Sequence, residues 1–206
     1  MEILGIVDCP LWILLLLGII ASVVLFCRHY SMDAISKLVF GLSINTHDDP
    51  NNEMARMAHK AWVAGTSANA LAFLLYCLAT NEKWQQRLTD EIDETFQKKT
   101  PSYDVMDLPC LDMIMSETFR LYPPFLRFNR TADSSTCVQG QTIPKGMDVF
   151  FPVFSSSNKE KHRYSYIPFG CGKRNCFGME LALLEVKLAA VKILQESHPH
   201  LKNLDF

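Results

Sequence analysis

The sequence has no large excess of charge, no internal repeat and no long low-complexity tract. Its 20 lysines and arginines nearly balance its 22 aspartates and glutamates, so the net charge is only −2. Nucleic-acid binding normally needs a strongly basic surface, and nothing in this composition predicts one. With 49% apolar residues over 206 positions, the chain is long enough for one or two globular domains.

The cysteines do not form the regularly spaced framework of a secreted, disulfide-rich domain. There are seven, an odd number, and they are scattered along the chain. Such cysteines fit free thiols in a reducing compartment. They stand at Cys9, Cys27, Cys77, Cys110, Cys137, Cys171 and Cys176.

One uninterrupted apolar run, from Leu11 to Cys27, lies near the N-terminus. As a helix it would span roughly 25 Å, close to the short end of what a bilayer requires. The alternative is a cleaved signal peptide, but that would need a basic start and small residues at a cleavage site. We expect a retained single-pass anchor. Because Arg28 follows the run, the positive-inside rule places the rest of the chain in the cytosol, as in a protein of the endoplasmic reticulum membrane.

The remaining segments predict a mainly helical chain with a small β portion. Residues 31–52 are rich in turn formers towards their end and are predicted to form a junction. Residues 53–80 predict a long, largely buried helix. Residues 82–99 predict an amphipathic surface helix, whose apolar residues recur every four positions at Trp84, Leu88, Ile92 and Phe96.

A third helix is predicted to start after Asp107 as its cap and to end at the prolines that follow Tyr122. Residues 125–154 carry short β-prone segments separated by turn residues. A last helix is predicted after Cys176.

Ten residues near the C-terminus have the pattern FxxGxRxCxG, formed by Phe169, Gly172, Arg174, Cys176 and Gly178. The glycines let the main chain pass close to a flat ligand, and the arginine offers a fixed cation to a carboxylate. A thiolate at the start of a helix is favoured by the helix dipole and by free backbone N–H groups. The pattern is typical of a loop that presents one cysteine sulfur to a haem iron.

A structural cysteine, a disulfide between Cys171 and Cys176, or half of a zinc site are the alternatives, although zinc would need further ligands at short spacing. Together with the preceding Tyr166, the segment resembles the cysteine loop of the cytochrome P450 family. The resemblance implies haem b as the cofactor, with Cys176 as the axial ligand of the iron and Phe169, Gly172, Arg174 and Gly178 as cofactor-binding residues.

The helix before Tyr122 carries Glu117 and Arg120, three residues apart and therefore on one face. Alone, such a spacing is usually a surface ion pair. In its context it resembles the ExxR helix of the same family, which implies a structural ion pair completed by an arginine from a later segment. This chain has no counterpart of that segment between Phe154 and Tyr164, so a buried pair would cost up to several kcal/mol.

Two further residues take roles only from the resemblance. Arg130 matches a position that contacts a haem propionate, and its alternative is a solvated arginine at a strand end. Thr66 matches the threonine that delivers protons to iron-bound dioxygen, while Gly65 stands where that relay has an acid. The alternative for Thr66 is a hydroxyl bonded to its own helix.

The opening residues 1–5 and the segments 121–130 and 184–188 are similar to the branch of the family that rearranges a prostaglandin endoperoxide, close kin of a drug-oxidising subfamily. The resemblance implies a partial cytochrome P450 fold with an anchor at 1–30, a junction at 31–52 and a partial haem domain at 53–206. It further implies oxidoreductase, monooxygenase or isomerase activity, a lipid-like substrate, contact with membrane lipid, and cytochrome P450 reductase as partner.

A full-length member of the family is more than twice as long, so the missing layers leave apolar faces uncovered. One alternative is therefore a catalytically silent, truncated form with no stable haem site. Another is a single-pass adaptor that uses basic residues around Lys159 and Lys173, although such charge runs are usually just solvated.

Overall fold

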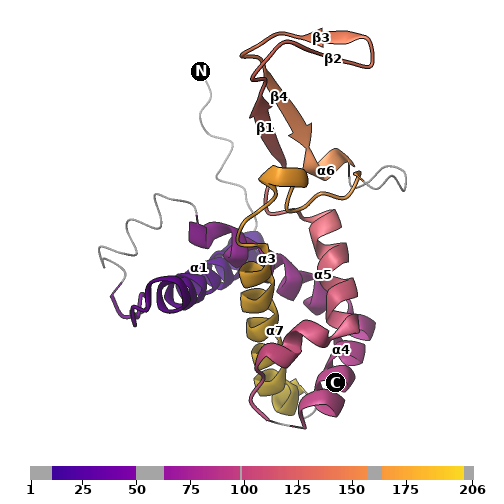
Figure 1. Cartoon of the computed structure of the whole chain (residues 1–206). Coiled ribbons are helices and arrows are strands. Elements are labelled where there is room, and N and C mark those ends of the chain that lie inside the picture. Colours follow the sequence, from indigo (N-terminus) through magenta and orange to yellow (C-terminus); the bar gives the residue numbers. More distant parts are fainter. Residues whose placement is uncertain (1–10, 50–62, 98, 157–163, 202–206) are drawn as a thin grey trace. The chain divides into compact units, whose positions relative to one another are not determined.

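A computed structural model describes residues 11–49, 63–97, 99–156 and 164–201. The chain divides into two compact units, Met1–Ala72 and Phe73–Phe206. The elements are coloured along the sequence in Figure 1.

The first unit is dominated by α1, Leu11–Phe40. The helix extends beyond the apolar run into the stretch predicted as a junction, and ends where Gly41 adopts a positive φ of 67°. The backbone amide of Gly41 then closes the last turn on the carbonyl of Lys37 at 3.1 Å. The following turn folds back on α1, because the amide of Thr46 donates to Asp33 Oδ1 at 2.9 Å.

Among the residues whose side chains the structure describes, we find no helix with an apolar stretch long enough to cross a bilayer. The run from Leu11 to Cys27 lies mostly outside that part of the chain. The membrane anchor therefore stays a prediction.

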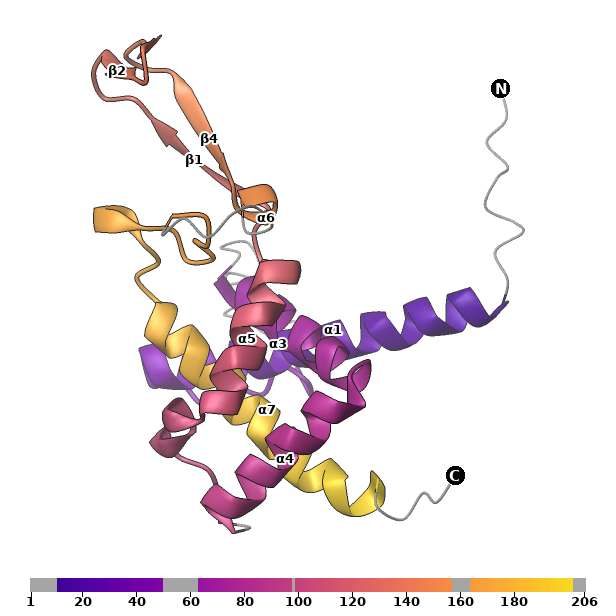
Figure 2. The same cartoon turned by 90° about the vertical axis from the view of Figure 1, so that its right-hand side faces the viewer.

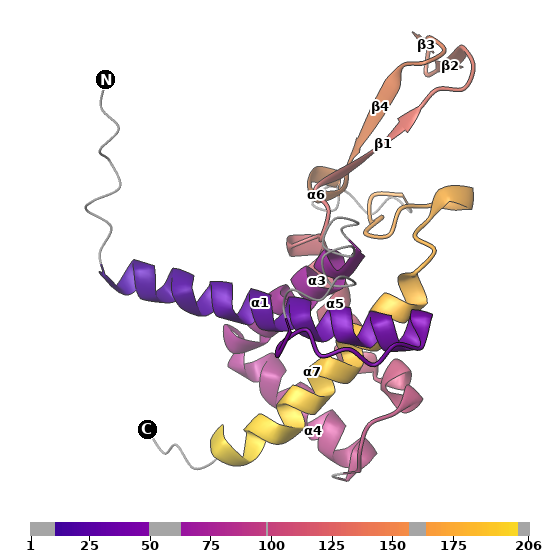
Figure 3. The same cartoon turned by 90° about the vertical axis from the view of Figure 1, so that its left-hand side faces the viewer.

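The helix α3, Val63–Ala79, contains the boundary between the units, and the remaining helices belong to the second unit. They include α4 at Glu82–Phe96, the 3-10 helix η1 at Tyr103–Asp107, α5 at Pro109–Leu121 and α7 at Met179–Leu201. α4 packs against α5 and α7, and α7 also packs against η1 (Figure 3). The mainly helical fold class is confirmed.

The amphipathic pattern of α4 is confirmed for three of its four expected apolar positions. Leu88, Ile92 and Phe96 are 0%, 1% and 4% exposed. Trp84 is 39% exposed, because it stands in the first turn of α4 at the rim of an open groove, where the guanidinium of Arg87 lies 5.3 Å from its ring centre. The spacing thus predicted which side of α4 is apolar, whereas the packing of the neighbouring helices determines which of those apolar residues are buried.

The start of α5 differs from the prediction. Asp107 ends η1, and the N-cap of α5 is Leu108, which makes no capping bond with its side chain. Pro109 occupies the first turn, where its missing N–H needs no partner. The amide of Cys110 instead donates to Glu91 Oε1 of α4 at 3.0 Å. A carboxylate from a neighbouring helix therefore caps the first turn of α5, the role predicted for Asp107.

The predicted β portion consists of two small antiparallel pairs (Figure 2). β1, Arg127–Thr131, pairs with β4, Asp148–Pro152, and β2, Thr136–Val138, pairs with β3, Gln141–Ile143. Gln139 and Gly140 both have positive φ, as the tight turn between β2 and β3 requires. A short helix, α6 at Val153–Ser156, follows β4.

Candidate functional site

The cysteine loop, Phe169–Gly178, contains the 3-10 helix η2, Gly172–Arg174, and leads into α7. Its shape comes from backbone hydrogen bonds inside the loop. The amide of Cys176 donates to the carbonyl of Phe169 at 2.8 Å, and the amide of Asn175 donates to that of Gly172 at 3.2 Å. Gly170 and Gly172 have φ of 74° and 71°, a region that other residues rarely adopt. The two glycines therefore allow the chain to fold into this loop.

Cys176 is exposed just before α7, whose first turn closes when the amide of Ala182 donates to the carbonyl of Gly178 at 2.9 Å. The predicted helix after Cys176 is confirmed. The thiol lies in the region where the N-terminal end of a helix favours negative charge. Its position suits a thiolate that binds a metal from outside the loop.

The helix α5 supports the loop from one side. The ring of Phe169 meets the ring of Phe119 edge to face, with centroids 5.6 Å apart. The hydroxyl of Tyr166 donates to the carbonyl of Ser116 at 3.2 Å. Burial raises the pKa of Tyr166, which outweighs the opposing effect of that hydrogen bond, so this hydroxyl remains a donor at neutral pH. Two aromatic side chains thus tie the loop to α5.

Glu117 and Arg120 of α5 form the predicted ion pair with two hydrogen bonds. Arg120 Nε donates to Glu117 Oε2 at 2.7 Å, and Arg120 Nη2 donates to Glu117 Oε1 at 2.6 Å. The side chains of Arg120 and Glu117 are 35% and 56% exposed. The expected cost of a buried, incompletely compensated pair does not arise, because both groups still contact water. The hydrogen bond from Arg120 lowers the pKa of Glu117.

Arg130, the residue expected at a haem propionate, lies on β1. Its Nη2 donates to the backbone carbonyl of Arg174 at 3.0 Å, and its Nη1 donates to the carbonyl of Asn129 at 2.8 Å. Arg174 is exposed at the end of η2. The resemblance implied a ligand contact for both arginines. The link between them was missed, since a side chain bonded to a distant carbonyl leaves no local signal in the sequence.

Thr66 and Gly65 lie near the start of α3 in the first unit, and both are half-buried. The cysteine loop belongs to the second unit. Thr66, predicted to deliver protons, thus belongs to the first unit, and Cys176, predicted to bind iron, belongs to the second. The role of Thr66 stays a prediction.

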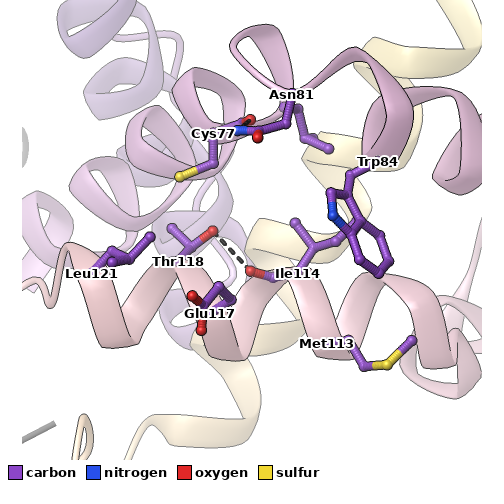
Figure 4. A pocket seen from close by; sticks show the side chains of 9 residues that line it. Cys77, Asn81, Trp84, Met113, Ile114, Glu117, Thr118 and Leu121 are labelled. Atoms are coloured by element: carbon purple, nitrogen blue, oxygen red, sulfur yellow. Dashed lines mark hydrogen bonds between the residues drawn. The ribbon is translucent and has the colours of Figure 1, made fainter. Parts of the chain in front are cut away.

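An open groove lies where the C-terminal end of α3 and the start of α4 face α5 (Figure 4). Its volume is about 390 Å³. Burial raises the pKa of the Cys77 thiol that lines it, and the nearby carboxylate of Glu117 acts in the same direction. The full lining is Cys77, Leu78, Asn81, Trp84, Met113, Ile114, Glu117, Thr118 and Leu121. This groove does not include the cysteine loop.

The alternatives to a haem loop can be compared with these contacts. Cys171 and Cys176 are both free and exposed, so the structure does not contain the disulfide between them. Within the described ranges, no three histidine, cysteine or acidic side chains gather as metal ligands. A zinc site therefore has no ligand set there, whereas haem needs only a single axial sulfur from the protein.

Comparison with known proteins places residues 61–202, which include nearly all of the second unit and the end of the first, within one family. The family model described as "Cytochrome P450" matches residues 61–156 and 154–202. Cytochrome P450 3A12 of Canis lupus familiaris is 39% identical over 153 residues, which make up 63% of this chain and 30% of that protein. Cytochrome P450 3A11 of Mus musculus is 35% identical over 192 residues, covering 75% of this chain and 38% of that protein. The chain thus spans about a third of the length of these relatives.

Proposed function

Because this chain belongs to the cytochrome P450 family, whose members bind haem b, we propose that it is a haem-thiolate protein with Cys176 as its axial ligand. The observation that carries the proposal is the geometry of the loop from Phe169 to Gly178. Its backbone hydrogen bonds and its contacts with α5 hold an exposed thiol directly before a long helix.

The side chains around this thiol fit one face of a haem. An exposed sulfur can reach an iron without moving the loop, and Cys176 is exposed. A Cβ added at Gly172 or Gly178 would meet no atom within 4 Å, so the main chain leaves open space at these two positions of the loop. Arg130 and Arg174 supply the cations that a propionate would need. The donor set therefore matches a thiolate-ligated porphyrin on the proximal side.

Each of these residues would have a distinct part in the chemistry. When bound, the haem supplies activation of dioxygen, because the thiolate sulfur pushes electron density towards the iron. Phe169 packs on α5 and keeps the loop in place, while Glu117 and Arg120 stiffen that helix. The hydroxyl of Thr66 would move a proton, but Gly65 has no group to pass that proton on.

The reaction class we propose is a monooxygenase reaction on a lipophilic small molecule, with cytochrome P450 reductase as electron donor. The similarity to cytochrome P450 3A proteins supports this class. The alternative is an isomerase like thromboxane-A synthase, which rearranges prostaglandin H2 to thromboxane A2 without an electron donor. The glycine at position 65 is compatible with that reaction, since it needs no proton relay.

We place the protein at the endoplasmic reticulum membrane, in contact with membrane lipid through its N-terminal segment. The support is the apolar run from Leu11 to Cys27, followed by the cationic Arg28. In this topology the run from Leu11 to Cys27 would cross the bilayer once and leave the cysteine loop in the cytosol.

The reduced carbon monoxide difference spectrum tests the proposal. The full chain, purified in detergent and loaded with haem, should give the band of thiolate-ligated haem, and Cys176→Ala should abolish it. Cys171→Ala is the matched control, because Cys171 lies in the same loop and is also exposed. A flat spectrum from the folded wild-type chain would refute the proposal and favour a catalytically silent form with no stable haem site.

A further inference from the structure

Arg130 joins two parts of the second unit that are far apart in sequence. It stands in β1 opposite Val149 of β4. Its guanidinium lies over the ring of Phe128, 5.0 Å from the ring centre, and that ring stacks on Phe151 with centroids 5.1 Å apart. Stacking of this kind limits the directions that a long side chain can take. The guanidinium of Arg130 is therefore held beside the β1–β4 pair.

The free end of the same side chain reaches the cysteine loop. Nη2 donates to the carbonyl of Arg174 at 3.0 Å, across a sequence separation of 44 residues. That carbonyl ends η2, immediately before the peptide that leads into Cys176. A hydrogen bond with a charged donor is stronger than one between neutral groups. Arg130 thus binds the main chain of the loop two residues before Cys176.

The loop's own backbone hydrogen bonds do not tie this part of it to another element. The amides of Asn175 and Cys176 donate back to the carbonyls of Gly172 and Phe169, which closes the loop on itself. The aromatic contacts of the loop tie its first half to α5. Among the hydrogen bonds of the described residues, the one from Arg130 links the second half of the loop to β1.

We propose that Arg130 is a positioning residue: it holds the main chain of the cysteine loop against the β1–β4 pair, and so sets the place of Cys176 before any ligand arrives. This differs from a role confined to a ligand's carboxylate. A guanidinium has five N–H donors, and the two hydrogen bonds described here leave donors for an anion. Arg130 can hold the loop and an anion together.

The consequence for Cys176 rests on the proposed haem-thiolate function, but the positioning itself is a property of the chain without haem. Hydrogen–deuterium exchange of the haem-free full chain in detergent, read by mass spectrometry on peptides covering Phe169–Gly178, separates the two. Failure of the proposed function would leave this exchange pattern unchanged.

The variants are Arg130→Gln, Arg127→Gln and Arg130→Lys. Arg127 is the matched control, since it lies on the same strand and its guanidinium stacks on Phe150 at 5.0 Å. We expect R130Q to speed exchange of the loop amides about three- to tenfold, the range for losing one partly exposed charged hydrogen bond. R127Q should leave the loop at the wild-type rate. R130K, which keeps a charged donor, should restore part of the protection.

The amides of α4 report whether a variant unfolds the unit as a whole, because α4 makes no contact with Arg130 in the hydrogen bonds described here. Faster exchange confined to the loop in R130Q supports the proposal. Equal loop exchange in R130Q and R127Q, a rise that extends equally to α4, or the absence of any rescue by R130K would each overturn it.

Discussion

A buried lysine on α7 leads to an asymmetric prediction about stability. The side chain of Lys187 is only 2% exposed, and its Nζ lies 2.7 Å from Asp112 Oδ1 of α5. The same Nζ donates to the carbonyl of Met106 in η1 at 2.9 Å. One ammonium group therefore joins α7, α5 and η1, while the side chain of Asp112 remains 56% exposed.

The two partners should not be equally costly to remove. Asp112→Ala leaves a buried charge with a single carbonyl as partner. Breaking a buried pair in this way costs about 3–5 kcal/mol, and the exposure of Asp112 reduces the expected loss to about 2 kcal/mol. Lys187→Met removes the buried charge itself, fills a similar volume and leaves an aspartate that water can solvate. We expect that variant to lose less than about 1 kcal/mol.

Urea unfolding of the full chain in detergent, followed by far-UV circular dichroism, measures the difference. With a slope of about 2 kcal/mol per M, D112A should lower the midpoint by about 1 M, and K187M by less than half of that. Lys192→Met is the control, because Lys192 forms an exposed pair with Glu196 on the same helix at 3.5 Å. A K187M midpoint as low as that of D112A would refute the reasoning.

Three other changes test the helical part of the second unit. Glu91→Ala should lower the free energy of unfolding in urea by about 1 kcal/mol, because the amide of Cys110 loses its acceptor. Glu91→Gln should cost less, because it keeps an oxygen there. Equal losses in the two variants would contradict a capping role. Leu88→Ala should cost about 2–4 kcal/mol in the same assay, since Leu88 is 0% exposed, and a loss below 1 kcal/mol would mean that this face of α4 is not packed. The lowered pKa of Glu117 means that its ion pair with Arg120 stabilises the fold above the ordinary carboxyl pKa, and that this contribution is lost as the pH falls through the lowered value. Between pH 7 and pH 3 the wild type should therefore lose slightly more free energy of unfolding than Glu117→Gln. The difference should be a few tenths of a kcal/mol, because the pair is exposed. Identical pH profiles would count against a stabilising pair.

Local patterns along the chain were enough to predict most of the elements. The four-residue spacing of Leu88, Ile92 and Phe96 predicted the buried face of α4, and the turn residues of 125–154 predicted the short strands. The helix after Cys176 followed from the apolar run behind it. Such signals lie within a few residues of one another, so they survive in a chain that spans only about a third of its relatives' length.

The sequence also predicted the cysteine loop and the pairing of Glu117 with Arg120, because spacing on a helix or in a glycine-rich turn sets those distances directly. Whether that pair is buried could not be predicted in the same way. Its exposure depends on which segments cover α5 in the tertiary structure.

The contacts between distant residues were decided by the tertiary structure alone. Glu91 replaces Asp107 in satisfying the first turn of α5, Lys187 reaches Met106, and Arg130 reaches Arg174. Each of these contacts joins elements that come together only when the helices and strands pack, so no periodicity or motif in the sequence predicts the contact. The sequence therefore establishes that a sulfur is presented at the start of α7, and the packing decides which side chains keep it there.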